Sequence, residues 1–302
     1  MIAMIAAALL AQSAESCPVE LVVLGVAQDA GIPQMGLDDD PAWDDASLRR
    51  LVVSLGVVDH VSGQRYLFEA TPDIREQTHR LNAVADASGA PDGIFVTHAH
   101  MGHYTGLMFL GFESMGTSDL PVYTLPLLAD FLTENGPWSQ LVSYNNIQLP
   151  RMQAGDTVEL TDRLSVEIFE VPHRREYAET AGFRIIGPEQ TAIFIPDING
   201  WDEWDDWGVR IEDYIEANDI AYLDATFFGD GEVPGRDMST FPHPLISESM
   251  ERFAPLSDEF RQRVRFIHFN RTNPVRFPDS AEQGIIRERG FRIAEEGERI
   301  CL

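Results

Sequence analysis

The chain has 302 residues, of which 44% are hydrophobic and 24% charged, which excludes disorder as its main state. Its 49 acidic and 22 basic residues give a formal net charge of −27, and every basic residue is an arginine. So negative a chain repels phosphate backbones and anionic lipid heads, and without lysine it can form neither a Schiff base nor a Walker-type phosphate loop. We therefore expect a small-molecule substrate, no nucleic-acid partner and no membrane insertion of the mature domain, and the oligomeric state stays open.

The first segment predicts an export signal. Residues 2–11, IAMIAAALLA, are uncharged and apolar, and the small and polar run QSAES follows them. An apolar core of about 10 residues is typical of a signal peptide, whereas a membrane span needs roughly 20. We expect residues 1–17 to be a signal peptide, residues 18–302 to form one domain, and the mature protein to be periplasmic or secreted; a fraying N-terminal helix is the alternative.

The only two cysteines, Cys17 and Cys301, lie near opposite ends of the expected mature chain. An oxidising compartment permits a disulfide between them. Lipidation of Cys17 as a membrane anchor is a second interpretation, although the preceding residues match a lipoprotein signal poorly. Two free thiols are the third, and the sequence leaves all three open.

Apolar runs of strand length recur along the chain, and helix-length segments alternate with the later ones. The runs are VELVVLGV from Val19, LRRLVVSLGVV from Leu48, RYLFEA from Arg65, GIFVTH from Gly93, LSVEIFEV from Leu164, TAIFIPD from Thr191, IAYLDATF from Ile220 and RVRFIHF from Arg263. The expected helical segments are residues 72–88, 125–135, 209–218, 244–254 and 280–289. This order predicts an α/β fold with a large mixed sheet system and helices on its outside. The acidic stretch WDEWDDWG from Trp201 predicts a surface loop.

Three of the eight histidines lie in residues 97–103, THAHMGH. His98 and His100 follow a buried strand and, two residues apart in an extended segment, can point the same way, while His103 begins the next helical segment. Three imidazoles at a strand end suit Zn²⁺, as one or two ions, or Fe²⁺ or Mn²⁺ when carboxylates join them. The alternative is a histidine-rich loop that makes ordinary hydrogen bonds.

Further polar residues each end a predicted strand or open a loop, which is where functional side chains tend to lie. These are His173, Asp197, Asp224, His243 and His268. Singly, each also fits a turn, a cap or a satisfied core residue. We interpret the remaining histidines, His60 and His79, as structural.

Taken in order, these segments resemble the metallo-β-lactamase superfamily. LVVLGVAQDAGIPQ resembles its first strand and glycine-bearing loop, LFEATPD its first acidic motif, THAHMGH its His-x-His-x-Asp-His signature, and VPH, IPD and IHF its later motifs. GVAQDAGIPQ, HMGHYTGLMFLG, YLDATFF, PHPLI and HFNRTNP are most similar to the pyrroloquinoline quinone biosynthesis protein B group, and the middle order of motifs also looks like ribonuclease Z. The resemblance implies a four-layer αβ/βα sandwich with metal between the edges of its two sheets.

The resemblance also implies roles for single residues. His98, His100 and His173 would hold a first metal, Asp197 would bridge to a second, and His103 and His268 would complete that second site. Gly102 stands where the signature has an Asp, which leaves three protein ligands where four are usual. Glu69 replaces another usual Asp. Asp197 would orient the attacking water, His243 would donate a proton to the leaving group, and Asp224 would orient His243.

Three functions follow as hypotheses. The first is a metal-dependent hydrolase of a small ester, lactone, amide or phosphodiester. The second, implied by the quinone-biosynthesis group, is an iron-dependent oxygenation or a role in handling that cofactor. The third is a non-catalytic ligand-binding protein in which Gly102 marks a degraded metal site.

Overall fold

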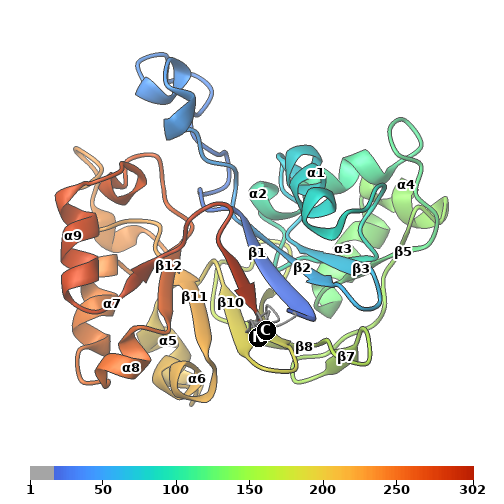
Figure 1. Cartoon of the computed structure of the whole chain (residues 1–302). Helices are drawn as coiled ribbons and strands as arrows, with labels where there is room; N and C mark the ends of the chain where they lie inside the picture. The colour runs from blue at the N-terminus through green and yellow to red at the C-terminus, as the bar shows by residue number, and fades with distance from the viewer. Residues whose placement is uncertain (1–16) are drawn as a thin grey trace, which may run out of the picture.

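The computed structural model describes residues 17–302, so the predicted signal peptide at residues 1–17 lies almost entirely outside the described residues. Two seven-stranded mixed sheets face each other, with helices on the outer side of each (Figure 1). The predicted four-layer α/β sandwich is therefore confirmed. None of the helices within residues 17–302 combines the length and apolar character needed to cross a bilayer.

The first sheet has the strand order β14-β1-β2-β3-β4-β5-β6 and the second has the order β13-β12-β11-β10-β9-β8-β7. The strands of the first sheet are β1 (Val19–Gly25), β2 (Ser54–Asp59), β3 (Gln64–Phe68), β4 (Gly93–Phe95), β5 (Leu120–Tyr123), β6 (Ile147–Gln148) and β14 (Arg299–Cys301). Those of the second are β7 (Thr157–Glu159), β8 (Ser165–Val171), β9 (Thr180–Ile186), β10 (Thr191–Ile195), β11 (Ile220–Asp224), β12 (Val264–Ile267) and β13 (Arg292–Ile293).

Helices α1 to α4 cover the first sheet and α5 to α9 cover the second (Figure 1). They are α1 (Ile74–Ala85), α2 (Met101–Tyr104), α3 (Pro126–Glu134), α4 (Trp138–Ser143), α5 (Trp201–Asp206), α6 (Ile211–Ala217), α7 (Ile246–Phe253), α8 (Asp258–Arg261) and α9 (Ala281–Glu288). An excursion between β1 and β2, drawn in blue in Figure 1, contains two short 3-10 turns at Pro41–Trp43 and Ala46–Leu48 and projects away from the sheets.

Strand β1 shows how the sequence builds the layers. Val19, Leu21 and Val23 point into the main core between the sheets, whereas Val22 and Leu24 belong to a second core with residues of α1. Successive side chains of a strand point to opposite faces, so a strand with apolar side chains on both faces is buried on both. The run VELVVLGV therefore places β1 inside the sandwich.

The parallel strands set the position of the polar strand ends. In the second sheet β10, β11 and β12 run parallel, and in the first sheet β3, β4 and β5 do. The carboxyl ends of parallel strands meet at one edge, where sites of α/β proteins form. The residues singled out from the sequence lie at the ends of β3, β4, β8, β10, β11 and β12 or in the segments that follow these strands.

All eight apolar runs contain a strand, and all five expected helical segments contain a helix. The prediction of a surface loop at residues 201–208 is wrong for its first part, because α5 begins at Trp201 and buries Trp201 and Trp204. The Trp201 indole N–H donates a 2.9 Å hydrogen bond to the Ser249 hydroxyl. Trp201 and Trp204 lie three positions apart, so both face the core from one side of a short amphipathic helix.

The C-terminal strand closes the first sheet beside β1. Strand β14 pairs with β1 in antiparallel register, with Glu20 opposite Cys301, and the Leu302 N–H donates to the Val19 carbonyl at 2.9 Å. This pairing brings Cys17 and Cys301 together, and they form a disulfide with Cα atoms 5.5 Å apart. The disulfide interpretation of the two cysteines is confirmed, and a sulfur held in a disulfide is not available to carry a lipid.

We expect the replacement Cys301→Ser to lower the free energy of unfolding by about 5 kcal/mol, because the bridge closes a loop that spans nearly the whole described chain. Denaturant unfolding of both proteins without reductant measures the difference. Reductant should shift the midpoint of the wild type and leave that of Cys301→Ser unchanged. Equal midpoints for the oxidised and reduced wild type would contradict this expectation.

Candidate metal centre

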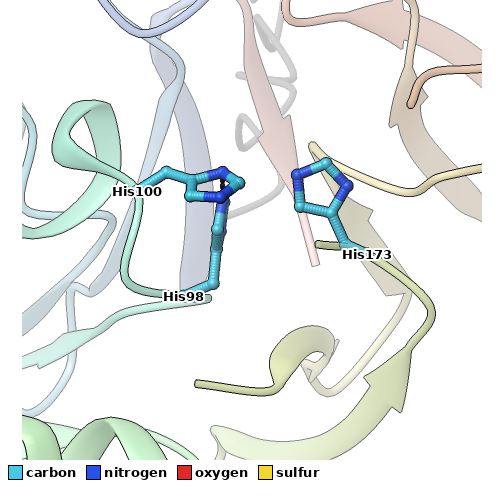
Figure 2. A group of neighbouring side chains, drawn as sticks. All are labelled: His98, His100 and His173. Atoms are coloured by element: carbon cyan, nitrogen blue, oxygen red, sulfur yellow. Dashed lines mark hydrogen bonds between the residues drawn. The ribbon is translucent and has the colours of Figure 1, made fainter. Parts of the chain in front are cut away.

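Three histidines from both sheets face one another at the shared edge. His98 and His100 lie after β4, and His173 faces them from the segment after β8 (Figure 2). His98 Nε2 and His100 Nδ1 are 2.8 Å apart, and the His173 ring centroid is 5.2 Å from that of His98 and 5.0 Å from that of His100. One nitrogen from each ring lies within 4.8 Å of the others, which allows all three to bind one ion.

A second group lies directly beside the first. His103, Asp197 and His268 come together as the resemblance implied: Asp197 Oδ2 is 3.1 Å from His103 Nε2 and 3.3 Å from His268 Nε2. The other oxygen of Asp197 is 3.6 Å from His173 Nε2. Asp197 therefore lies between the two groups, in the position of a bridging carboxylate. The ligand role of these six residues remains a prediction, whereas their convergence is a property of the fold.

The hydroxyl of Thr97 fixes which nitrogen of His98 is free. It donates a hydrogen bond of 2.5 Å to Glu69 Oε1, and its oxygen lies 2.8 Å from His98 Nδ1. Since the only proton of the hydroxyl is used, Nδ1 must be the nitrogen that donates to it. The lone pair of His98 is then on Nε2, the atom that faces His100.

The second sheet repeats this arrangement with different residues. The Thr226 hydroxyl donates to Asp224 Oδ1 at 2.7 Å and lies 2.8 Å from His268 Nδ1. By the same argument His268 carries its proton on Nδ1 and presents the lone pair of Nε2 to Asp197. Each sheet thus supplies one acid, one threonine and one histidine whose free nitrogen faces the site.

Asp224 also contacts His243, the pair that the resemblance implied. Its Oδ2 accepts from His243 Nδ1 at 2.8 Å and from the Ile198 N–H at 3.0 Å. Burial would lower the pKa of His243, but the Asp224 carboxylate and the hydrogen bond to it raise this pKa above the ordinary value. His243 Nε2 is therefore the nitrogen left to exchange a proton with a ligand.

Burial and charge divide the other histidines into two kinds. Burial lowers the pKa of His98 and His173 well below the ordinary value, and neighbouring imidazoles lower it further. Burial acts in the same direction on His103, but the Asp197 and Glu69 carboxylates raise its pKa well above the ordinary value. His98 and His173 are thus neutral and suited to bind a cation, whereas the carboxylates around His103 attract positive charge, which a proton supplies when no cation is bound.

Two of the strand-end residues have an unusual backbone. Glu69 follows β3 with φ of 77°, and His268 follows β12 with φ of 74°. Positive φ is costly for residues other than glycine and tends to persist at functional sites, where the surrounding structure enforces it. Here it turns a carboxylate and an imidazole into the edge at the point where each strand stops.

Next to Gly102 the structure places a carboxylate in addition to the three protein groups expected at the second site. Asp29, which follows β1, lies beside Gly102 with its Oδ1 3.0 Å from His103 Nε2 and 3.8 Å from His268 Nε2. A fourth donor is therefore present. Sequence reasoning missed Asp29 because the loop that contains it was interpreted through its glycine alone. A single acid after a buried strand, in a chain whose signature lacks one, was the available signal.

The donor set fits a divalent metal. His268 Nε2 and Asp197 Oδ2 are buried and have no hydrogen-bond partner within the described part of the chain. Buried polar atoms are nearly always paired, so two orphaned donor atoms that face each other indicate a missing partner. A cation between them would satisfy both. His60, by contrast, pairs with Glu20, and His79 is exposed on α1, which fits the structural roles predicted for them.

Comparison with known families shows the family of the chain. The model of the beta-lactamase superfamily domain matches residues 64–269, which is well over half of the chain. The chain belongs to the beta-lactamase superfamily. The matched region of this superfamily member contains Glu69, the three-histidine segment, His173, Asp197, Asp224, His243 and His268. Asp29 lies before it.

Relatives and solved structures agree with this family. The superfamily member is 24% identical to the coenzyme PQQ synthesis protein B of Methylorubrum extorquens, over 92% of this chain and 98% of the relative. The crystal structure of Zn(2+)-bound PqqB from Methylobacterium extorquens covers 94% of this chain and all of its own, with a TM-score of 0.75 at 21% identity. A diphosphatase from the PhnP family covers 94% and 98%, with a TM-score of 0.63 at 20% identity. At these identities the solved structures establish the shared fold.

We expect the replacement Thr97→Val to weaken Zn²⁺ binding at the three-histidine group about 10–100-fold, the usual effect of losing a partner that orients a ligand. Valine keeps the shape but leaves His98 Nδ1 without an acceptor. Competition with a chromophoric chelator measures the affinity. Thr133→Val, on an exposed position of α3, is the matched control and should leave it unchanged. Equal Zn²⁺ affinity in wild type and Thr97→Val would contradict the argument that Thr97 fixes the tautomer of His98.

Proposed function

We propose that the chain is a metal-dependent hydrolase that uses metal-activated water to cleave a small ester, lactone, amide or phosphodiester. The observation that carries this proposal is the approach of three neutral imidazole donors, a central carboxylate and a carboxylate-bound histidine at one edge of the fold. Fold alone does not decide function, so the argument rests on this site.

Zinc is the proposed metal. Nitrogen donors in a three-histidine group suit Zn²⁺, with Fe²⁺ or Mn²⁺ as alternatives where carboxylates contribute, as they do beside His103 and His268. The solved structure of PqqB from Methylobacterium extorquens, whose title gives bound Zn²⁺, supports this choice. His98, His100 and His173 would hold the first ion.

Asp197 and His243 have separate roles in the proposed reaction. A bound divalent metal lowers the pKa of water from 15.7 to about 7 and polarises the bond under attack. Asp197 lies 3.6 Å from His173 Nε2 and orients the attacking water through its carboxylate. His243, held at Nδ1 by Asp224, gives a proton from Nε2 to the leaving group. The raised pKa of His243 keeps that proton available near neutral pH.

The surroundings offer both apolar and charged groups to a small substrate. His243 lines a surface cavity of about 980 Å³ together with Trp201 and Phe241, and with charged side chains that include Asp237 and Arg252. Met101, directly after His100, is 74% exposed, and Tyr177, directly after the Glu176 that contacts His100, is 67% exposed. Apolar groups on both sides of polar donors are typical of small-molecule sites. The net charge of −27 disfavours a polyanionic substrate such as RNA.

We expect His243→Ala to lower kcat about 10²–10⁴-fold while the bound metal stays unchanged, because His243 moves a proton and is not among the first-metal ligands. The double replacement His98→Ala/His100→Ala should remove the first ion and the activity. The assay uses p-nitrophenyl acetate, a γ-lactone, a p-nitroanilide and bis(p-nitrophenyl) phosphate, with elemental analysis of each protein. His79→Ala, exposed on α1, is the control.

Two outcomes would oppose the hydrolase. If no probe is turned over and the protein as purified contains iron and consumes oxygen, a role like that of coenzyme PQQ synthesis protein B, in oxygenation or cofactor handling, takes its place. The 24% identity over 92% of the chain supports this second candidate. If metal binds and a small ligand is retained without turnover, the chain is a binding protein.

We also propose that the domain works outside the cytoplasm, in the periplasm or the medium. The bridge between Cys17 and Cys301 supports this, since structural disulfides persist in oxidising compartments. Cell fractionation followed by intact-mass measurement should find a mature chain that begins close to Cys17 with two hydrogen masses missing. A full-length chain with two free thiols in the cytosol would contradict it. A mass increase at Cys17 would indicate the lipid anchor instead.

A further inference from the structure

The position of Asp29 explains why residue 102 is a glycine. A side chain at position 102 would place its Cβ 2.4 Å from Asp29 Cα, 2.6 Å from Asp29 Oδ1 and 2.8 Å from Asp29 Cβ. Atoms cannot approach this closely, and the backbone of Asp29 cannot yield as the end of a flexible side chain can. Asp29 therefore occupies the space that an acidic side chain on α2 would need.

We propose that Asp29 is a metal ligand and that it replaces the signature carboxylate that Gly102 lacks. The inference rests on the proposed metal site and names the residue that completes its second half. The carboxylate of Asp29 is 3.0 Å from His103 Nε2 and 3.8 Å from His268 Nε2, and a donor atom of each of the three lies within 4.8 Å of the other two. His268 Nε2 is buried and, within residues 17–302, has no hydrogen-bond partner. An ion between Asp29, His103, Asp197 and His268 gives that nitrogen its partner.

The loop holds Asp29 firmly enough for such a role. Ala27 forms isolated bridges to Val52, just before β2, and to Phe269, just after β12, and the Gln28 N–H donates to the Phe269 carbonyl at 2.9 Å. The side chains of Gln28 and Asn270 are hydrogen-bonded to each other. Asp29 is thus tied to the residues that directly follow His268, so the distance between the two potential ligands is set by backbone contacts.

The second group has the same number of carboxylates as it would have with the signature Asp at position 102. Moving an acid from position 102 to position 29 leaves the count of carboxylates around His103 unchanged. Histidine and carboxylate donors together suit Zn²⁺, Fe²⁺ or Mn²⁺. The side chain of Asp29 is 44% exposed, whereas that of its partner His103 is fully buried.

Metal stoichiometry tests the proposal without any assay of activity. Protein saturated with Zn²⁺ and then desalted should hold two ions per chain in the wild type and one in Asp29→Ala and in Asp29→Asn. In both variants the affinity for the second ion, measured by chelator competition, should fall at least about 100-fold. Loss of a residue that only orients a ligand lowers the affinity less. Asp39→Ala, exposed in the same excursion, is the control and should retain two ions. Thermal unfolding of the metal-free proteins verifies that the variants fold.

A second variant, Gly102→Ala, tests the same contact from α2. Its Cβ would lie 2.4 Å from Asp29 Cα, so it must displace the backbone of residue 29, and we expect it to lose the second ion and keep the first. Two tightly bound ions in Asp29→Ala would overturn the proposal. Loss of the first ion in His98→Ala/His100→Ala reports on the hydrolase separately, so the two proposals fail by different measurements.

Discussion

The structure depends on holding imidazole lone pairs toward one point without protonating the rings that must bind a cation. Six of the eight histidines gather at one edge of the sandwich, and water around them would supply protons freely. Burial prevents this for His98 and His173, and a threonine hydroxyl fixes the tautomer of His98 and of His268. A threonine already committed to Glu69 or Asp224 can only accept from its histidine, so the free nitrogen is decided before any ligand arrives.

This constraint explains why both sheets are required. The acid, threonine and histidine of the first sheet lie after β3 and β4, and those of the second lie after β11 and β12. One sheet alone would supply only half of the potential ligands, because His98 belongs to the first sheet and His268 to the second. The sandwich supplies their separation, and the main core between the sheets holds it fixed, because interiors packed at crystal-like density resist small displacements. The pairing of β14 with β1 and the Cys17–Cys301 bridge then secure the ends of the chain to that frame.

Much of this could be predicted from the sequence. The apolar runs gave the strands because a run buried on both faces has few other structures available, and THAHMGH placed the histidines at a strand end. Strand β9 was not predicted, since its residues Thr180–Ile186 include polar side chains and a glycine and receive their order from β8 and β10. Helix α5 was mistaken for a loop because its acidic residues concealed the burial of Trp201 and Trp204. Both errors arise from tertiary contacts that a local pattern does not contain.

Asp29 could not be predicted for a related reason. Its neighbours in the site, His103 and His268, lie 74 and 239 positions away in the chain, and no spacing rule links them. What links them is a loop held by contacts elsewhere. Arg276 holds Asp40 through two hydrogen bonds of 2.9 and 3.0 Å, and Ala27 bridges to Val52 before β2 and to Phe269 after β12. A helix fixes a ligand through its own hydrogen bonds, whereas a loop needs such external contacts to reach the same precision. The long excursion between β1 and β2 has them near its start and near its middle, and for that reason a carboxylate on it can take the place of one on α2.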